Sequence, residues 1–197
     1  MNYLLPGILL ITVAMGISYT AFRLFTDVRS GIFERFQSLP IARSSVLWAH
    51  VLTSVVSSLV SLVLVVLVAV LMGFRSPAGV LGWLAVTGIL VLFTLALTWI
   101  AVIAGLSAKT VDGAGALAYP LVFLPFLSSA FVPTDTMPGP VRAFAENQPV
   151  TSVVDAIRAL LARQPVSTDV WLALGWCLGI LVVAYALAMT TCRRTTA

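Results

Sequence analysis

The sequence predicts an all-α protein, a polytopic helical transmembrane bundle of about five spans. Of its 197 residues, 60% are hydrophobic and only 9% are charged, whereas a typical soluble domain has roughly 25% charged residues. The apolar residues come in blocks of about 18 to 27, which is long enough to cross a ~30 Å hydrocarbon layer as helix. The alternating segments of a transmembrane β-barrel, about ten residues each, do not occur in this pattern.

Five apolar blocks qualify as spans, and polar joints separate them. They cover residues 3–22, 46–72, 81–106, 114–131 and 170–189. We expect the block 114–131 to be the kinked span, because it contains Pro120 and Pro125. The whole chain, residues 1–197, then forms a single membrane domain.

The Lys and Arg residues predict the orientation, since cytoplasmic joints carry the excess of these residues. The joints 23–45 and 107–112 and the C-terminus together carry seven, namely Arg23, Arg29, Arg35, Arg43, Lys109, Arg193 and Arg194. The opposite side carries four, namely Arg75, Arg142, Arg158 and Arg163. We therefore expect the segment 23–45, called the elbow below, and the C-terminus to be cytoplasmic, and the segment 132–169 to be extracellular.

The charge pattern disfavours several function classes. No Asp, Glu, Lys or Arg lies in the middle of a predicted span, although ion-coupled transporters and proton relays need such groups. The basic residues form no run, which argues against a nucleic-acid partner. The sequence has no G-x-x-x-x-G-K-[ST] loop for a nucleotide phosphate. His50 has no second ligand at helical spacing, and Cys177 and Cys192 are interpreted as free thiols, so we expect no metal or cofactor in this chain.

The elbow is predicted to contain a short amphipathic helix that ends before Pro40. Its apolar positions recur at helical spacing and are Ile32, Phe33, Phe36 and Leu39. Glu34 and Arg35 occupy polar positions of the same turns. Two interpretations stay open from these features alone, an interfacial anchor or a rigid docking element that passes force from a soluble partner to the spans.

The segment 132–169 contains a second amphipathic pattern, with an apolar stripe formed by Val150, Val153, Val154, Ile157, Leu160 and Leu161. Ser152 and Asp155 have the spacing of a capping box, and Asp155 can pair with Arg158 at i,i+3. We expect this helix to lie in the outer leaflet or to fold back between the spans. A catalytic role for Asp155 is less favoured, because neither it nor Asp135 has a nearby His or second acid in the sequence.

Two stretches, FERFQSLPIARSSVLWAHVL and FVPTDTMPGPVRAFAENQPVTSVVDAIRALL, resemble the permease subunit of type-2 ATP-binding-cassette (ABC) exporters of the daunorubicin-resistance-like branch. They match in order and spacing, and the similarity covers nearly the whole chain. The resemblance implies a separate ATP-binding subunit that uses the ATP, with two permeases and two ATPases in the assembly. It also implies that the elbow is a coupling helix that docks on the ATPase through Ile32, Phe33, Glu34, Arg35, Phe36 and Leu39.

The resemblance further implies re-entrant extracellular helices, which would carry Asp135, Pro138, Glu146, Asp155 and Arg158. It places the chain in the cytoplasmic membrane, with membrane lipid and a second permease copy or homologue as neighbours. The implied cargo is a hydrophobic drug, lipid or polyketide, which fits the lack of charge within the spans. Family members usually begin with a cytoplasmic amphipathic helix and one further span, so we expect this chain to start at the equivalent of their second span.

Two other function classes stay open at this point. One is a lipid-modifying membrane enzyme that acts through Asp135, Glu146 or Asp155. The other is a membrane anchor that binds a partner without moving any cargo. Loss of export on changing Glu34 or Phe33 would favour the permease, and loss of activity only on changing Asp155 would favour the enzyme.

Overall fold

The computed structural model describes residues 3–30, 43–108, 110–132, 138–164 and 168–195. In these residues it is helical with no strand, as the composition predicts. The elements in chain order are α1 (Leu5–Arg29), α3 (Arg43–Leu71), α4 (Val80–Ser107), α5 (Val111–Phe123), the short 3-10 helix η1 (Leu124–Leu127), α6 (Gly139–Glu146), α7 (Pro149–Leu161) and α8 (Thr168–Thr195).

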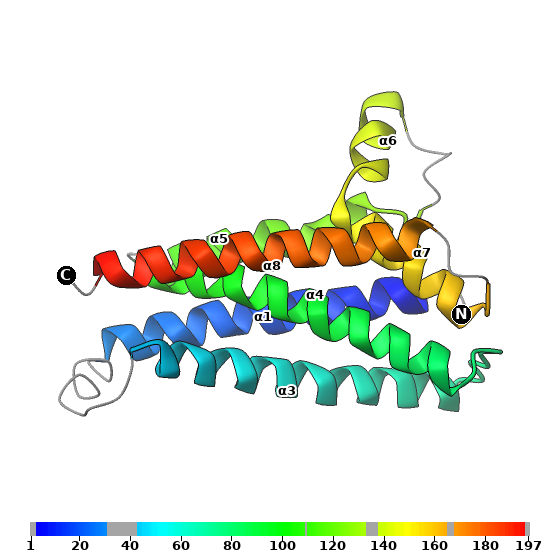
Figure 1. Ribbon diagram of the computed structural model, residues 1–197, viewed down its shortest axis with the longest axis horizontal. Helices are drawn as coiled ribbons and strands as arrows, with labels where there is room; N and C mark the ends of the chain where they lie inside the picture. Colours follow the sequence, from blue (N-terminus) through cyan, green and yellow to red (C-terminus); the bar gives the residue numbers. More distant parts are fainter. Residues whose placement is uncertain (1–2, 31–42, 109, 133–137, 165–167, 196–197) are drawn as a thin grey trace.

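Four of these helices, α1, α3, α4 and α8, are long and apolar enough to cross a membrane. They lie side by side along the long axis of the molecule (Figure 1). The predicted block 114–131 is instead divided between α5 and η1, with Pro120 inside α5 and Pro125 in the first turn of η1. A proline removes a backbone donor and disfavours a continuous helix. The chain therefore changes from an α-helix to a 3-10 helix where the sequence predicted a kink.

The two pieces still cross the bundle together. At about 1.5 Å per residue for α5 and about 2.0 Å for η1, they cover about 28 Å. This is close to the ~30 Å thickness of the hydrocarbon layer. Figure 1 shows the segment running from the end where α8 stops to the end where α7 lies. The prediction of about five crossings therefore fits four continuous helices and one broken one.

The two ends of the bundle carry different connections (Figure 1). At one end α1 stops, α3 starts, α4 passes to α5, and α8 stops; we call this the elbow end. At the other end lie the start of α1, the α3–α4 loop, and α6 and α7; we call this the α7 end. The joints that the sequence assigns to one side of the membrane thus lie at one end of the bundle.

The first span is longer than predicted. The boundary at Phe22 was wrong, because α1 continues to Arg29 and includes the start of the predicted elbow. Leu24 and Phe25 in this extension are buried against neighbouring helices, so the apolar stripe of α1 continues between the charged residues. Residues 43–45 of the elbow begin α3. Elbow residues 31–42, including Ile32, Phe33, Glu34, Arg35, Phe36 and Leu39, lie outside the described part of the chain.

Helix α4 is the centre of the bundle and packs against α1, α3, α7 and α8. Of its most apolar stretch, 67% is buried, against 17% for α3 and 22% for α8. The last two helices therefore present most of their surface to the lipid. Gly105 sets the close approach of α4 to α1, because a Cβ there would lie 3.0 Å from the Ala21 carbonyl oxygen and 3.1 Å from the Leu24 Cβ.

We predict that Gly105→Ala destabilises the bundle by about 1–3 kcal/mol, because the added methyl group must push α1 away from α4. Gly88→Ala in the same helix is the matched control. A Cβ at Gly88 has open space around it, so that substitution should be neutral or slightly stabilising. Unfolding in dodecylmaltoside micelles titrated with SDS measures both variants. Equal midpoints for the two would contradict the close α1–α4 contact.

Candidate functional site

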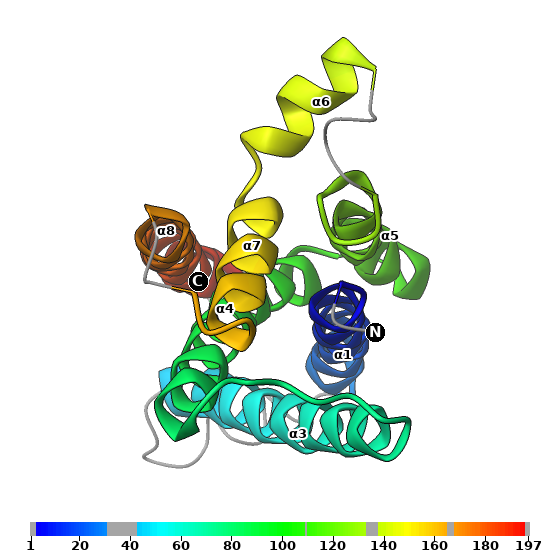
Figure 2. The same cartoon turned by 90° about the vertical axis from the view of Figure 1, so that its right-hand side faces the viewer.

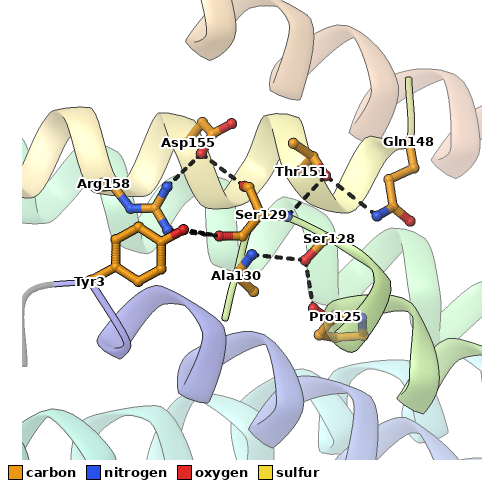
Figure 3. Close-up of polar contacts among 9 residues, drawn as sticks. All are labelled: Tyr3, Pro125, Ser128, Ser129, Ala130, Gln148, Thr151, Asp155 and Arg158. Atoms are coloured by element: carbon orange, nitrogen blue, oxygen red, sulfur yellow. Dashed lines mark hydrogen bonds and ion pairs between the residues drawn. The ribbon is translucent and has the colours of Figure 1, made fainter. Parts of the chain in front are cut away.

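The chain turns sharply at the α7 end, directly after η1, and side chains from three elements hold this turn (Figure 3). Ser128 caps it from within, since its Oγ donates to the Pro125 carbonyl at 2.6 Å and accepts from the Ala130 N–H at 3.1 Å. Gln148, which precedes α7, donates to the Leu127 carbonyl at 2.6 Å. The Gln148 bond satisfies a carbonyl that the end of η1 leaves free, and the two Ser128 bonds close the turn that follows.

Ser129 is the point where α1, α7 and the turn meet (Figure 3). Its carbonyl oxygen accepts from the Tyr3 hydroxyl at 3.1 Å and from an Arg158 Nη at 3.0 Å. Its N–H donates to Thr151 Oγ1 at 3.4 Å, and its hydroxyl donates to Asp155 Oδ1 at 2.9 Å. The segment 128–130 is thereby connected to both neighbouring helices by hydrogen bonds. We call Tyr3, Ser128, Ser129, Gln148, Thr151, Asp155 and Arg158 the polar cradle.

Arg158 contacts three other residues of the polar cradle. Its Nη1 lies 2.7 Å from Asp155 Oδ1, as the i,i+3 spacing predicted. Its guanidinium carbon lies 4.1 Å from the centroid of the Tyr3 ring, which is a cation–π contact. One planar guanidinium thus binds a carboxylate, a carbonyl and an aromatic ring at once, a combination that an ammonium group cannot reproduce.

The position of α7 agrees with its sequence pattern in most respects. Val150, Val153, Val154, Ile157 and Leu161 are buried, and α7 packs on α4 and α8. The predicted capping box was wrong, because α7 begins at Pro149 and Ser152 lies inside the helix. Asp155 is therefore free to accept from Ser129 and Arg158. Proline at the first helical position supplies the start signal instead.

The other predicted residues of this region do not join the polar cradle. Glu146 pairs with Arg142 at 2.7 Å on α6, with both side chains about half exposed. Helix α6 projects away from the bundle (Figure 2), and Pro138 is exposed just before it. Asp135 lies outside the described residues. Sequence reasoning found Asp155 and Arg158 but missed Tyr3, Ser128, Ser129, Gln148 and Thr151.

The chemistry of the polar cradle is that of a structural joint. The Asp155 carboxylate is occupied by Ser129 and Arg158, and neither is a general base for it to orient. Among the residues that the structure describes, no three His, Cys, Asp or Glu side chains lie close enough to hold a metal ion. The arrangement positions α7 and offers no acid/base pair for a reaction.

The elbow end is held by different contacts. His50 Nε2 on α3 lies 3.4 Å from Asp27 Oδ2 on α1, so the contact joins the two helices that flank the elbow. Further into the bundle, Thr20 of α1 and Ser54 of α3 share a 2.9 Å hydrogen bond. The Trp99 ring of α4 packs edge-on against Trp48 of α3 and Tyr185 of α8, with centroids 5.2 and 4.9 Å away. These contacts fix the ends of α1 and α3 relative to the central helix.

Comparison with known proteins adds the family. The model of the ABC-2 type transporter family matches residues 1–162, which include the whole of α1 to α7. The chain belongs to the ABC-2 type transporter family. This confirms the resemblance found in the sequence, and it agrees with the helical bundle that the structure shows.

Two curated relatives are similar over most of this chain. The daunorubicin resistance ABC transporter permease protein DrrB1 of Streptomyces coeruleorubidus is 31% identical over 201 aligned residues, which cover 100% of this chain and 70% of the relative. The probable doxorubicin resistance ABC transporter permease protein DrrC of Mycobacterium tuberculosis is 29% identical over 183 residues, which cover 91% of this chain and 65% of the relative. The chain thus spans about two thirds of the length of these relatives.

We predict that Arg158→Lys destabilises the protein by about 1–2 kcal/mol, because lysine loses the paired donors and much of the stacking on Tyr3. Arg142→Lys is the control, since its pair with Glu146 is exposed and should contribute about 0–0.5 kcal/mol. Detergent unfolding of both variants measures the difference. Similar losses for the two would show that the polar cradle does not depend on the guanidinium.

The environment of Asp155 predicts that the stability of the folded protein depends on pH. Burial of the Asp155 carboxyl raises its pKa, and the charge of Asp169 raises it further. The Ser129 hydrogen bond and the Arg158 charge lower the pKa, but by less than burial raises it. The folded protein therefore binds this proton more tightly than the unfolded chain, and stability attributable to Asp155 falls as pH rises from the unfolded pKa through the folded one. Asp155→Asn should remove this loss. Melting temperatures of both proteins across the acidic range test it, and parallel profiles would contradict it.

Proposed function

We propose that the chain acts as the membrane permease of an exporter that is powered by a separate ATP-binding subunit. The observation that carries the proposal is the match to the ABC-2 type transporter family over residues 1–162. The architecture supports it, because four long apolar helices and one broken crossing form a bundle without any acid/base pair in the polar cradle. ATP would be used by the partner subunit, and this chain would supply the path through the membrane.

The elbow is the proposed docking element for that subunit. Its residues Ile32, Phe33, Glu34, Arg35, Phe36 and Leu39 connect two helices that the structure fixes in place. The Asp27–His50 contact joins the ends of α1 and α3 on either side of the elbow, and α1 packs on the central helix α4. A push on the elbow would therefore be passed to α1, α3 and α4 together. This is the mechanical requirement for coupling ATP hydrolysis to movement of the spans.

The cargo is proposed to be a hydrophobic molecule of the drug, lipid or polyketide class. The names of the two relatives refer to daunorubicin and doxorubicin resistance, and the spans of this chain carry no charge in their middle that would require an ionic cargo. A second copy or homologue would complete the path. The exposed aromatic side chains of α5 and η1, Tyr119, Phe123 and Phe126, suit either that copy or lipid.

The competing functions receive less support. A lipid-modifying enzyme would need Asp155 as an acid or base, yet that carboxylate already binds Ser129 and Arg158. A pure anchor would bind the ATPase and move nothing. Intracellular accumulation of a fluorescent anthracycline separates the anchor from the permease. Cells with the chain and its ATPase should accumulate less dye, and the difference should vanish in an ATPase mutant that cannot hydrolyse ATP.

The docking proposal predicts that a tagged chain in mild detergent retains an ATP-binding subunit and that Glu34→Arg loses it. Reversing this charge should disrupt the proposed contact surface. Glu146→Arg is the matched control, because Glu146 lies on α6 at the opposite end of the bundle. Mass spectrometry of the soluble proteins that copurify gives the readout. Equal recovery of the ATPase with both variants would overturn the assignment of the elbow.

The orientation predicts which single cysteines react from outside the cell. Cysteines replacing Ala143 on α6 and Ser30 after α1 lie at exposed positions at opposite ends of the bundle. In a background with Cys177 and Cys192 replaced by alanine, a membrane-impermeant maleimide should label Ala143→Cys in intact cells. It should label Ser30→Cys only after permeabilisation. The reverse pattern would invert the proposed topology.

A further inference from the structure

Helices α1 and α3 enclose an apolar groove at the α7 end. The groove has a volume of about 440 Å³ and is lined entirely by apolar residues, among them Ile8 of α1, Val68 of α3 and Phe74 of the α3–α4 loop. Most of the surface of α3 is exposed, and Figure 2 shows this helix at the edge of the bundle. The groove therefore opens where the hydrocarbon chains of a bilayer would lie.

A smaller pocket lies next to this groove, and we call it the polar pocket because two of its six lining residues are polar. It has a volume of about 170 Å³ and lies between the α3–α4 loop and the end of α7, where Ser76 and Arg158 contribute to its lining. Phe74 lines both spaces, so the groove and the polar pocket are neighbours. A hydrogen bond of 2.6 Å from Ser76 Oγ to the Leu161 carbonyl fixes the loop against α7. This hydrogen bond holds two sides of the polar pocket in a fixed position relative to each other.

The surroundings of the polar pocket carry an excess of positive charge. Arg158 lines the pocket, and its Nε is buried with no hydrogen-bond partner in the described residues. Arg75 lies between two lining residues, and its exposed side chain has no ion pair within the described chain. Arg163 is exposed just beyond α7. Asp155 pairs with Arg158, and the Asp169 charge is close enough to act on Asp155. The three arginines and two aspartates therefore leave one positive charge in excess near the groove.

We propose that the groove and the polar pocket together bind one anionic phospholipid. An acyl chain would occupy the groove along α3, and the phosphate would lie beside the exposed guanidinium of Arg75, next to the pocket that Arg158 lines. An apolar space that ends at a net positive charge matches an anionic amphiphile, since the acyl chain avoids water and the phosphate finds a basic partner. A zwitterionic lipid would also bury its acyl chain in the groove, but its headgroup would gain little from the positive charge.

Native mass spectrometry of the full chain, released from mild detergent with added lipid, tests the proposal. The two probes are phosphatidylglycerol and phosphatidylcholine with identical acyl chains. We expect one phosphatidylglycerol to be retained per chain, bound about fivefold more tightly than phosphatidylcholine, which is the factor expected for one basic residue near an anionic headgroup. Equal retention of the two lipids would overturn the proposal.

Two matched pairs of variants locate the site. Arg75→Gln should lower the affinity for phosphatidylglycerol about fivefold, whereas Arg142→Gln on the projecting α6 should not. Val68→Trp should fill the groove and weaken both lipids, whereas Val60→Trp should not, because Val60 is equally exposed on α3 but does not line the groove. If Val68→Trp fails to fold, the comparison of Arg75→Gln with Arg142→Gln still tests the lipid site. No difference within the arginine pair would contradict the site.

A second copy of the chain is the alternative occupant of the groove. Single Val68→Cys chains, in the background without Cys177 and Cys192, should then form disulfide-linked dimers in native membranes. Such dimers would overturn the lipid proposal, and monomers would agree with it. None of these measurements involves the ATPase subunit, so failure of the lipid site would leave the proposed permease function untouched.

Discussion

Hydrocarbon offers no hydrogen-bond partner, so a membrane helix can stop or change type only where protein groups satisfy the freed backbone. This chain breaks its crossing between α5 and η1 at Pro120 and Pro125 and then turns sharply at Ser128. The polar cradle meets the requirement, since Gln148 and Arg158 donate to the carbonyls of Leu127 and Ser129. The position of α7 follows from this need, because both donors belong to α7 or directly precede it.

The same constraint connects the α7 end to the rest of the bundle. Tyr3 at the start of α1 donates to the carbonyl that Arg158 also binds, and Gly7 lets the turn approach α1 closely. The apolar stripe of α7 packs on α4, which in turn meets α1 through Gly105. Moving α7 away from the bundle would leave the Leu127 carbonyl without its side-chain donor and the Ser129 carbonyl with Tyr3 alone, and an unsatisfied carbonyl costs several kcal/mol in lipid. We therefore expect α1, α4 and α7 to move as one body during transport.

Much of the fold could be predicted from the sequence, because uninterrupted apolar length is a local property that the membrane imposes. The stripe of α7 and the Asp155–Arg158 pair were likewise visible as short-range spacing. The polar cradle was not, because Tyr3 and Ser129 are 126 residues apart and no local pattern pairs them. The two consecutive serines after LPFL, at the end of an apolar block, were the signal that could have indicated a break. The end of α1 was misplaced because charged residues at a helix end resemble a joint when burial is unknown.

Formation of a disulfide between Gly7→Cys and Ala130→Cys tests most directly whether the broken segment crosses the bundle and turns beside α1. A Cβ at Gly7 would lie 3.1 Å from the Cβ of Ala130 and 2.9 Å from the Phe131 ring, so a shift of the turn by less than about 1 Å brings the two Cβ atoms to the roughly 3.5–4.5 Å separation of a disulfide. In a background without Cys177 and Cys192, mild oxidation in native membranes should link the pair nearly completely. The pair Gly7→Cys and Gly139→Cys should stay reduced, because Gly139 begins the projecting α6. No link in the first pair, or an equal yield in both, would contradict the crossing and the polar cradle that depends on it.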